Sequence, residues 1–228
     1  QNLGASGLSQ RQFEALKEHV QKYADQIAPA IQEVKERLLQ EKKSKQTEKI
    51  LSVHVDNVNV VVRGKAGKKV EFGNTCILAE NIDGYVMGWK FYKEQAPAET
   101  RQAQDLITQL LKIEADTPMK AVVTDRGMNS KANSKFLEEN DLKDFTCSRS
   151  PKVLAKRMEN PLFSQMQKRR ACTEGRIGIL KNAKMDGQPR SRTFENRNQV
   201  MASTIVCHNL WVLARLLQRQ EKQLQQAA

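Results

Sequence analysis

Residues 120–129 read KAVVTDRGMN, and the rest of the chain is organised around this stretch. Three small or β-branched apolar residues, 121–123, lead directly into the sequence TDRG, which is typical of a buried strand that ends at a tight turn. In open α/β sheets, ligands and catalytic groups collect at the carboxyl ends of strands. Asp125 is therefore either a functional carboxylate or an aspartate that caps the next helix. This stretch alone favours neither interpretation.

The composition sets limits on the class of protein. The 228 residues are 39% hydrophobic, enough for a core, and contain no long apolar run, so we expect no transmembrane span and no membrane partner. The amino terminus has no signal-peptide pattern and does not begin with Met, which predicts a processed or truncated piece. Four scattered Cys without a CxxC motif and three scattered His predict reduced thiols in a cytoplasmic protein, without disulfides or a zinc site.

The charge of the chain is unevenly distributed. The net charge is +12, and residues 143–197 hold fourteen Lys and Arg against five Asp and Glu. A concentrated basic field attracts polyanions, most often nucleic acid. The plainer interpretation is a solvated basic surface, but the clustering of the charges favours the interpretation that this stretch binds a polyanion.

The pattern along the chain predicts a mixed α/β fold. Residues 1–48 have helical periodicity with a capping box at Ser9 and Gln12, and Pro29 is expected to end or kink the first helix, which predicts a helical hairpin. The expected later strands are 50–62, 70–80, 85–92, 121–124 and 145–148, with a basic glycine turn at 63–69 and an Asp-Gly turn at 81–84. The expected later helices are 97–114, 130–140, 168–183 and 199–220. Hairpins followed by helix-linked strands are typical of a mixed sheet.

The helix expected over 168–183 carries one acid, Glu174, among five cations. The plain interpretation is a surface ion pair with Arg170, four residues earlier. The functional interpretation is a carboxylate in a basic cleft that, together with Asp125, holds Mg²⁺ or Mn²⁺ against a phosphodiester. Both interpretations stay open at the level of the sequence.

Three motifs in order give a resemblance to a known family. TDRGMNSKAN (124–133) is followed, 49 residues after its Asp, by the Glu of RRACTEGRIGILK (169–181). Both resemble the second-Asp and Glu motifs of bacterial insertion-sequence DDE transposases. GKAGKKVEFG (64–73) resembles a basic hairpin, and CHNLWVLARLL (207–217) resembles the closing helix, in one branch of that family. The resemblance covers about residues 50–217.

The resemblance implies an RNase H-like mixed sheet flanked by helices, and DNA cleavage and strand transfer with two Mg²⁺. It implies that Asp125 is the second acid and Glu174 the third, both as metal ligands. It further implies DNA as the partner, both element ends and target, a place at the bacterial nucleoid, and a homo-oligomer as an open option. The implied division is a helical insertion at 1–48, the catalytic domain at 49–217 and a Gln-rich tail at 218–228. The residues expected to meet DNA phosphates are Lys65, Lys68, Lys69, Arg126, Arg169, Arg170, Arg176 and Lys181.

The first acid of the family's trio has two possible origins. It either lies on a first strand that this chain lacks, or it is Asp56, 69 residues before Asp125. Two functions follow: a metal-dependent transposase present as its carboxy-terminal part, or an inactive remnant that still binds DNA. A basic RNA-binding protein is a weaker alternative, because only 5% of the residues are aromatic and no paired stacking platform is visible.

Overall fold

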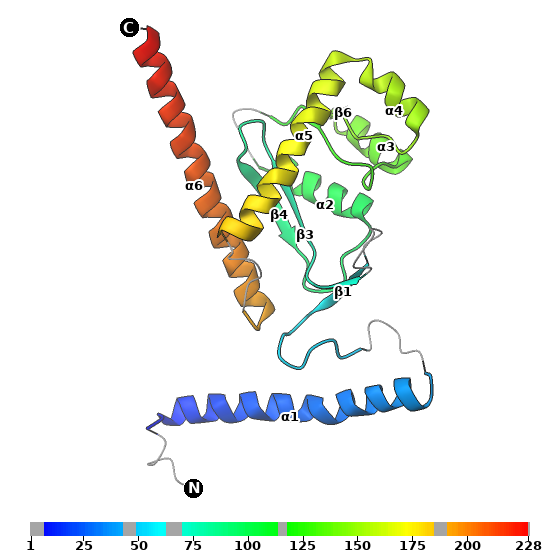
Figure 1. Cartoon of the computed structure of the whole chain (residues 1–228), viewed down its shortest axis with the longest axis vertical. Coiled ribbons are helices and arrows are strands. Elements are labelled where there is room, and N and C mark those ends of the chain that lie inside the picture. Colours follow the sequence, from blue (N-terminus) through cyan, green and yellow to red (C-terminus); the bar gives the residue numbers. More distant parts are fainter. Residues whose placement is uncertain (1–6, 43–48, 63–69, 114–117, 185–190, 228) are drawn as a thin grey trace. The chain divides into compact units, whose positions relative to one another are not determined.

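The computed structural model describes residues 7–42, 49–62, 70–113, 118–184 and 191–227. The chain divides into two compact units, Gln1–Asn74 with Arg192–Phe194, and Thr75–Ser191 with Glu195–Ala228. Helices and short strands alternate in the second unit, so the mixed α/β class is confirmed. Figure 1 shows the course of the chain.

The first unit contains one long helix, α1 (Gln10–Leu39). The predicted capping box is confirmed, because Ser9 Oγ accepts a hydrogen bond from the backbone N–H of Gln12 and Gln12 Oε1 accepts one from the N–H of Ser9. The predicted helical hairpin is wrong for the described residues, since the helix continues through Pro29. The apolar spacing keeps its phase on both sides of Pro29, so a continuous helix loses one backbone hydrogen bond but keeps a single stripe.

The apolar stripe of α1 is exposed in the first unit. It consists of Leu16, Val20, Ile27, Ile31, Val34 and Leu38, each more than half exposed. Another side of the helix carries the contacts that the unit does make: Lys22 pairs with Asp56 at 2.6 Å, and Glu33 Oε2 accepts a hydrogen bond from the N–H of Ile50. The segment at 50–57 therefore packs along α1 and leaves the stripe uncovered.

The strand predicted over 50–62 is shorter than expected. Only β1 (Asn59–Val62) is extended, and it pairs antiparallel with β2 (Val70–Gly73). The residues before β1 form turns, in which Ser52 Oγ accepts a hydrogen bond from the N–H of Val55 and Asn57 has a positive φ of 52°. These local bonds satisfy the backbone without a strand partner. The hairpin tip at 63–69 lies outside the described residues.

Two short sheets lie in the second unit. The antiparallel pair β3 (Cys76–Glu80) and β4 (Val86–Phe91) is joined by the predicted Asp-Gly turn. In this turn Asn81 Oδ1 accepts the N–H groups of residues 83–85, and Gly84 has a φ of 98°, which favours glycine. The parallel pair is β5 (Ala121–Val122) with β6 (Lys143–Asp144).

The parallel pairing extends beyond these assigned strands. The N–H groups of Phe145 and Cys147 donate to the carbonyl oxygens of Val122 and Thr124, at 2.9 and 3.0 Å. The strand predicted at 145–148 is thus a continuation of β6, and the predicted strand at 121–124 is paired to its end. Among the described residues the strands form three separate pairs and not one continuous sheet.

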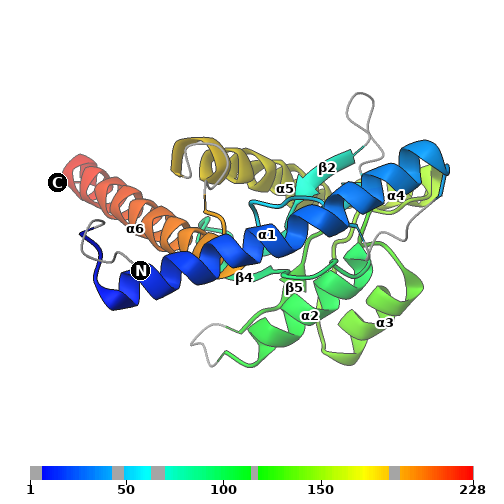
Figure 2. The same cartoon turned by 90° about the horizontal axis from the view of Figure 1, so that it is seen from below.

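Helix α2 (Glu99–Leu111) packs against both sheets of the second unit. Leu106 and Leu110 lie over Gly88 of β4, where a Cβ would come within 2.9 Å of Leu110. Ile107 joins a buried cluster with Leu137 and Leu142, against which Val122 packs. Helix α3 (Lys131–Glu139) lies beside α2, as Figure 2 shows. One of the two buried clusters of the second unit therefore lies between these helices and the parallel strand pair.

The remaining helices are α4 (Pro151–Met158), α5 (Pro161–Ile179), a π-helical turn (Leu180–Lys184) and α6 (Phe194–Ala227). Helix α5 begins seven residues before the predicted start, because Asn160 accepts the N–H groups of Leu162 and Phe163 and Pro161 opens the first turn. Helix α6 runs on through the glutamine-rich residues. Its apolar side packs Ile205 against Val86 and Leu180.

By length and composition alone, α6 is long and apolar enough to cross a membrane, with a mean hydropathy of 1.5 over its most apolar window. A core helix passes the same test. His208, which is fully buried, contacts the Gly84 carbonyl oxygen at 3.2 Å, and Asn209 hydrogen-bonds to Val86. These contacts show that this part of α6 packs against the β3–β4 pair.

Candidate functional site

Asp125 lies immediately after the paired end of β5. Its Oδ1 accepts a hydrogen bond from the N–H of Gly127 at 2.9 Å, and the side chain is exposed. It does not cap α3, because Ser130 does so by accepting the N–H of Asn133. The capping interpretation of Asp125 is therefore wrong, and its carboxylate lies on an exposed turn at the carboxyl end of a parallel strand pair.

Arg149 fixes the turn that carries Asp125. Its Nε donates to the carbonyl oxygen of Arg126 at 2.9 Å, and its Nη2 donates to that of Gly127 at 2.8 Å. Two bonds from one planar guanidinium define the position of the turn better than a single bond would. The neighbouring Arg126 side chain is exposed, as a phosphate-binding residue requires.

A second carboxylate, which the sequence did not reveal, lies beside Asp125. A Cβ at Gly127 would collide with the Glu99 carboxylate and would lie 3.2 Å from Asp125 Oδ1. The two carboxylates thus share the space above one glycine. Glu99 stands in the first turn of α2, where an acid is also favoured by the helix dipole. Because the helix dipole already explains an acid at this position, the sequence alone does not mark Glu99 as a candidate site residue.

Glu174 has a different neighbour. Its Oε1 pairs with Arg170 at 2.8 Å, and 68% of the side chain is exposed. The simple ion pair predicted from the spacing is confirmed. Within the described part of the chain, no three His, Cys, Asp or Glu side chains gather closely enough to hold a metal ion. Asp125 and Glu174 each contact their own partners.

Glu80, at the end of β3, is the centre of a buried ionic cluster. Its side chain is 7% exposed and pairs with both Arg169, at 3.2 Å, and Arg176. The hydroxyl of Thr173 donates to its Oε1 at 2.8 Å. Arg169 also donates to the Ile82 carbonyl oxygen at 2.6 Å. Two arginines that the sequence assigned to DNA therefore also connect α5 to the β3–β4 turn.

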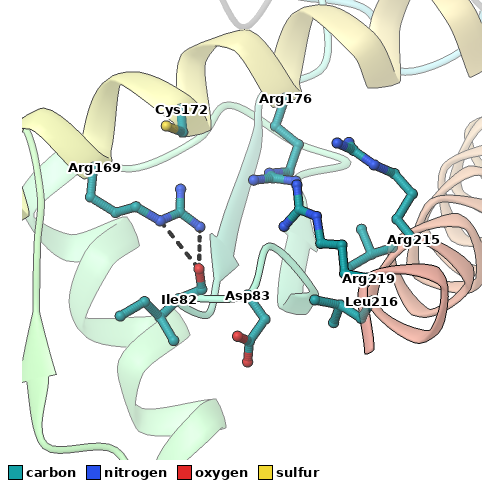
Figure 3. Close-up of a pocket in the computed structure, with 9 residues that line it drawn as sticks. Ile82, Asp83, Arg169, Cys172, Arg176, Arg215, Leu216 and Arg219 are labelled. Carbon is teal, nitrogen blue, oxygen red and sulfur yellow. Dashed lines mark hydrogen bonds between the residues drawn. The ribbon is translucent and has the colours of Figure 1, made fainter. Parts of the chain in front are cut away.

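The same two arginines border a pocket between α5, α6 and the β3–β4 turn. Its volume is about 260 Å³. Figure 3 shows Arg169 and Arg176 entering from α5, and Arg215 and Arg219 from α6. The lining is completed by Ile82, Asp83, Cys172, Val212 and Leu216. Arg215 and Arg219 were missed from the sequence, although their spacing of four residues puts them on one helix face.

The other residues expected at the site have simple positions. Lys181 is exposed on the π-helical turn, and the Arg170 guanidinium forms an ion pair with the Glu174 carboxylate. Asp56 lies in a turn of the first unit, paired with Lys22, and not in the middle of a strand as expected. Three further lysines lie outside the described residues: Lys65, Lys68 and Lys69.

Comparison of the chain with protein-family models, with curated proteins and with solved structures finds no match.

Proposed function

We propose that the chain acts on DNA as the carboxy-terminal part of a DDE transposase catalytic domain. The motif resemblance motivates the proposal. The observation that carries it is the position of Asp125, on an exposed turn directly after a parallel strand pair, which is where α/β folds place their chemistry. Arg149 fixes that turn, and the basic pocket described above lies in the same unit.

The finer fold belongs to the same proposal. An RNase H-like arrangement requires the β3–β4 and β5–β6 pairs to be parts of one mixed sheet. Two helices support this, since α2 packs on β4 and on Val122, and α5 bonds to Glu80 and, through Gln167, to the Phe145 carbonyl oxygen. Both helices therefore connect the two strand pairs.

The chemistry of the carboxylates fits a hard divalent cation. Asp125 and Glu99 offer exposed oxygen ligands side by side, which suit Mg²⁺ or Mn²⁺. Glu174 is the third carboxylate of the proposal; in the described structure it pairs with Arg170 and does not gather with the other two. When bound, such a cation stabilises the charge that develops on a phosphodiester during hydrolysis or transfer. Arg126 and Arg149 would hold a phosphate near the Asp125 turn.

The test is cleavage or strand transfer on element-end DNA with Mg²⁺ or Mn²⁺. We expect Asp125→Asn to reduce the rate by at least 100-fold, because the substitution removes the charge and keeps the size of the side chain. Lys152→Gln, an exposed residue on α4, is the control. Equal rates for Asp125→Asn and the unaltered protein would remove Asp125 from the proposed site.

A second function is a DNA-binding protein that does not cleave. The pocket arginines support it, since they do not depend on the carboxylates at Asp125. This function predicts salt-sensitive DNA binding that is equal with and without divalent cation. Metal-dependent cleavage by the purified chain would exclude it.

A homo-oligomer is also part of the proposal. The apolar residues Phe13, Val20, Ile27 and Val34 recur every seven positions along α1, and Leu16 and Tyr23 occupy the intervening positions. A seven-residue repeat matches a partner helix in a coiled coil better than it matches a sheet. Most of these side chains are exposed. A second copy of α1 supplies the same stripe and is the partner that we propose.

A further inference from the structure

The pocket between α5 and α6 has more positive than negative charge. Of its four guanidinium groups, Arg169 and Arg176 pair with Glu80, whereas no acid among the described residues pairs with Arg215 or Arg219. Among the described residues that line the pocket, Asp83 is the only acid, and its carboxylate points away from the guanidinium groups in Figure 3. A surplus of guanidinium groups around one space favours an anion.

Three of the four guanidinium groups, those of Arg169, Arg176 and Arg215, are held in place by contacts with their surroundings. Arg176 lies against Gly84, where a Cβ would collide with its guanidinium. The Arg215 guanidinium lies over the Trp211 ring, with its Cζ 4.6 Å from the ring centroid. Arg176 and Arg219 extend toward one another across the pocket (Figure 3). Fixed donors lose little conformational entropy when they bind an anion.

Apolar side chains form another part of the lining. Ile82, Val212 and Leu216 supply aliphatic surface between the charged groups. The volume of about 260 Å³ lies below the roughly 300–1,000 Å³ of pockets that enclose a whole small molecule. Cys172, Arg215 and Arg219 are exposed, so the pocket is open to solvent. Its size and openness suit one unit of a longer polyanion better than an enclosed metabolite.

We propose that this pocket binds a phosphodiester group of DNA, with Arg215 and Arg219 on the phosphate and the sugar or base against Ile82, Val212 and Leu216. The site rests on the proposed DNA-acting function and adds α6 to the DNA-binding surface. An acidic peptide is the competing ligand of another class. Its carboxylates would meet the same guanidinium groups but would not contribute a nucleotide's flat apolar surface.

A cysteine in the pocket provides a direct test. Cys172 lines the pocket and is exposed, and Cys207 is exposed on α6 outside it. The experiment measures the rate of iodoacetamide alkylation at each thiol by mass spectrometry, with and without a duplex oligonucleotide. We expect saturating DNA to slow alkylation of Cys172 at least fivefold and to leave Cys207 unchanged. Deoxynucleoside monophosphate and an oligo-glutamate peptide are the comparison ligands.

Two substitutions complete the test. Arg219→Gln and Arg215→Gln each remove one phosphate contact, so the slope of log affinity against log salt should fall by about 0.9 for duplex DNA. In both variants, DNA should also protect Cys172 from alkylation less than it does in the unaltered protein. Lys222→Gln is the matched control, since it removes the same charge one turn further along α6 and outside the pocket. For Lys222→Gln, the salt dependence of DNA affinity should be steeper than for either arginine variant.

The outcomes distinguish a failure of the pocket proposal from a failure of the proposed function. One outcome is DNA binding that does not protect Cys172 and that has equal salt slopes in all three variants. This outcome would reject the proposal that the pocket binds DNA, but it would not reject the proposed DNA-acting function. Protection by the monophosphate or the oligo-glutamate but not by DNA would also reject the pocket proposal. Absence of any DNA binding would reject both proposals together.

Discussion

At the scale of single residues, Glu80 is the centre of a buried cluster of charged groups. Its carboxylate accepts from Thr173 and pairs with Arg169 and Arg176, and its side chain is 7% exposed. Removing one partner from a buried pair leaves the others charged without compensation. This cluster therefore contributes to stability far more than a surface ion pair of the same length.

We expect Glu80→Ala to lower the free energy of unfolding by about 3–5 kcal/mol, because two arginines lose their counterion. Urea denaturation followed by tryptophan fluorescence measures it, since Trp89 and Trp211 both belong to the second unit. Glu174→Gln breaks an exposed pair with Arg170 and should cost less than about 1 kcal/mol. Similar losses for the two variants would contradict the burial of Glu80.

A second prediction at this scale concerns Cys76. Burial raises the pKa of its thiol from 9.0 to about 12, against a smaller lowering by Lys181. The unfolded chain releases this proton near pH 9 and the folded chain does not. The stability that the thiol contributes is therefore complete below pH 9 and is lost as the pH rises toward 12.

We expect the stability of the unaltered protein to fall more steeply than that of Cys76→Ala between pH 9 and 11, by up to about 1 kcal/mol per pH unit. Urea midpoints at several pH values under reducing conditions provide the measurement. Cys172→Ala, at an exposed thiol, is the control and should follow the unaltered protein. Parallel curves for all three proteins would refute the prediction.

Some residues of the candidate site could be predicted from the sequence and others could not. The strand-then-turn pattern placed Asp125 correctly, because it depends on neighbours in the chain. Glu99 was missed because it reaches the Asp125 turn only when α2 packs, and Gly127 leaves space for it. Arg215 and Arg219 were missed because they lie beyond the basic stretch and join Arg176 only in the folded unit.

At the scale of elements, α6 is attached to β4 by side-chain hydrogen bonds. Asn209 accepts the Val86 N–H at 2.9 Å and donates to the Val86 carbonyl oxygen at 3.0 Å. His208 adds a contact to the Gly84 carbonyl oxygen. The position of the helix, and with it that of Arg215 and Arg219, therefore depends on these residues.

We expect Asn209→Ala to cost about 1–3 kcal/mol, because it leaves both backbone groups of Val86 without their partner. Hydrogen exchange at the Val86 amide should accelerate by the corresponding factor of roughly 5–150. Ser203→Ala, at an exposed position of α6, should change neither quantity. Unchanged exchange in Asn209→Ala would disprove the role given to this hydrogen bond.

The elements also show where sequence patterns fail. The capping box and the Asp-Gly turn were predicted correctly, since each is a local hydrogen-bond pattern. Pro29 predicts an end or a kink, but it costs one bond within a helix that continues and whose stripe remains in phase. The alternation at 50–58 resembled a strand, yet Ser52 and Asn57 form turns there. Whether the strand pairs make one sheet depends on long-range pairing, which no local pattern encodes.

At the scale of the whole molecule, the apolar stripe of α1 predicts self-association. We expect Ile27→Asp to lower the average mass measured by sedimentation, because a charge at the centre of the stripe opposes helix pairing. Ala28→Asp adds the same charge at the next position, off the stripe, and should leave the mass unchanged. A monomeric mass for the unaltered protein at micromolar concentration would argue against a second copy as the partner.

The bonds between Asn209 and Val86 have a further consequence for how molecules of this protein behave toward one another. A strand with unused N–H and C=O groups is a template on which a foreign strand can add, and repeated addition leads to fibrils. The amide of the Asn209 side chain bonds to the N–H and C=O groups of Val86, which an added strand would otherwise pair with its own peptide group. We therefore expect the loss of Asn209 to raise the tendency to aggregate as well as to lower stability.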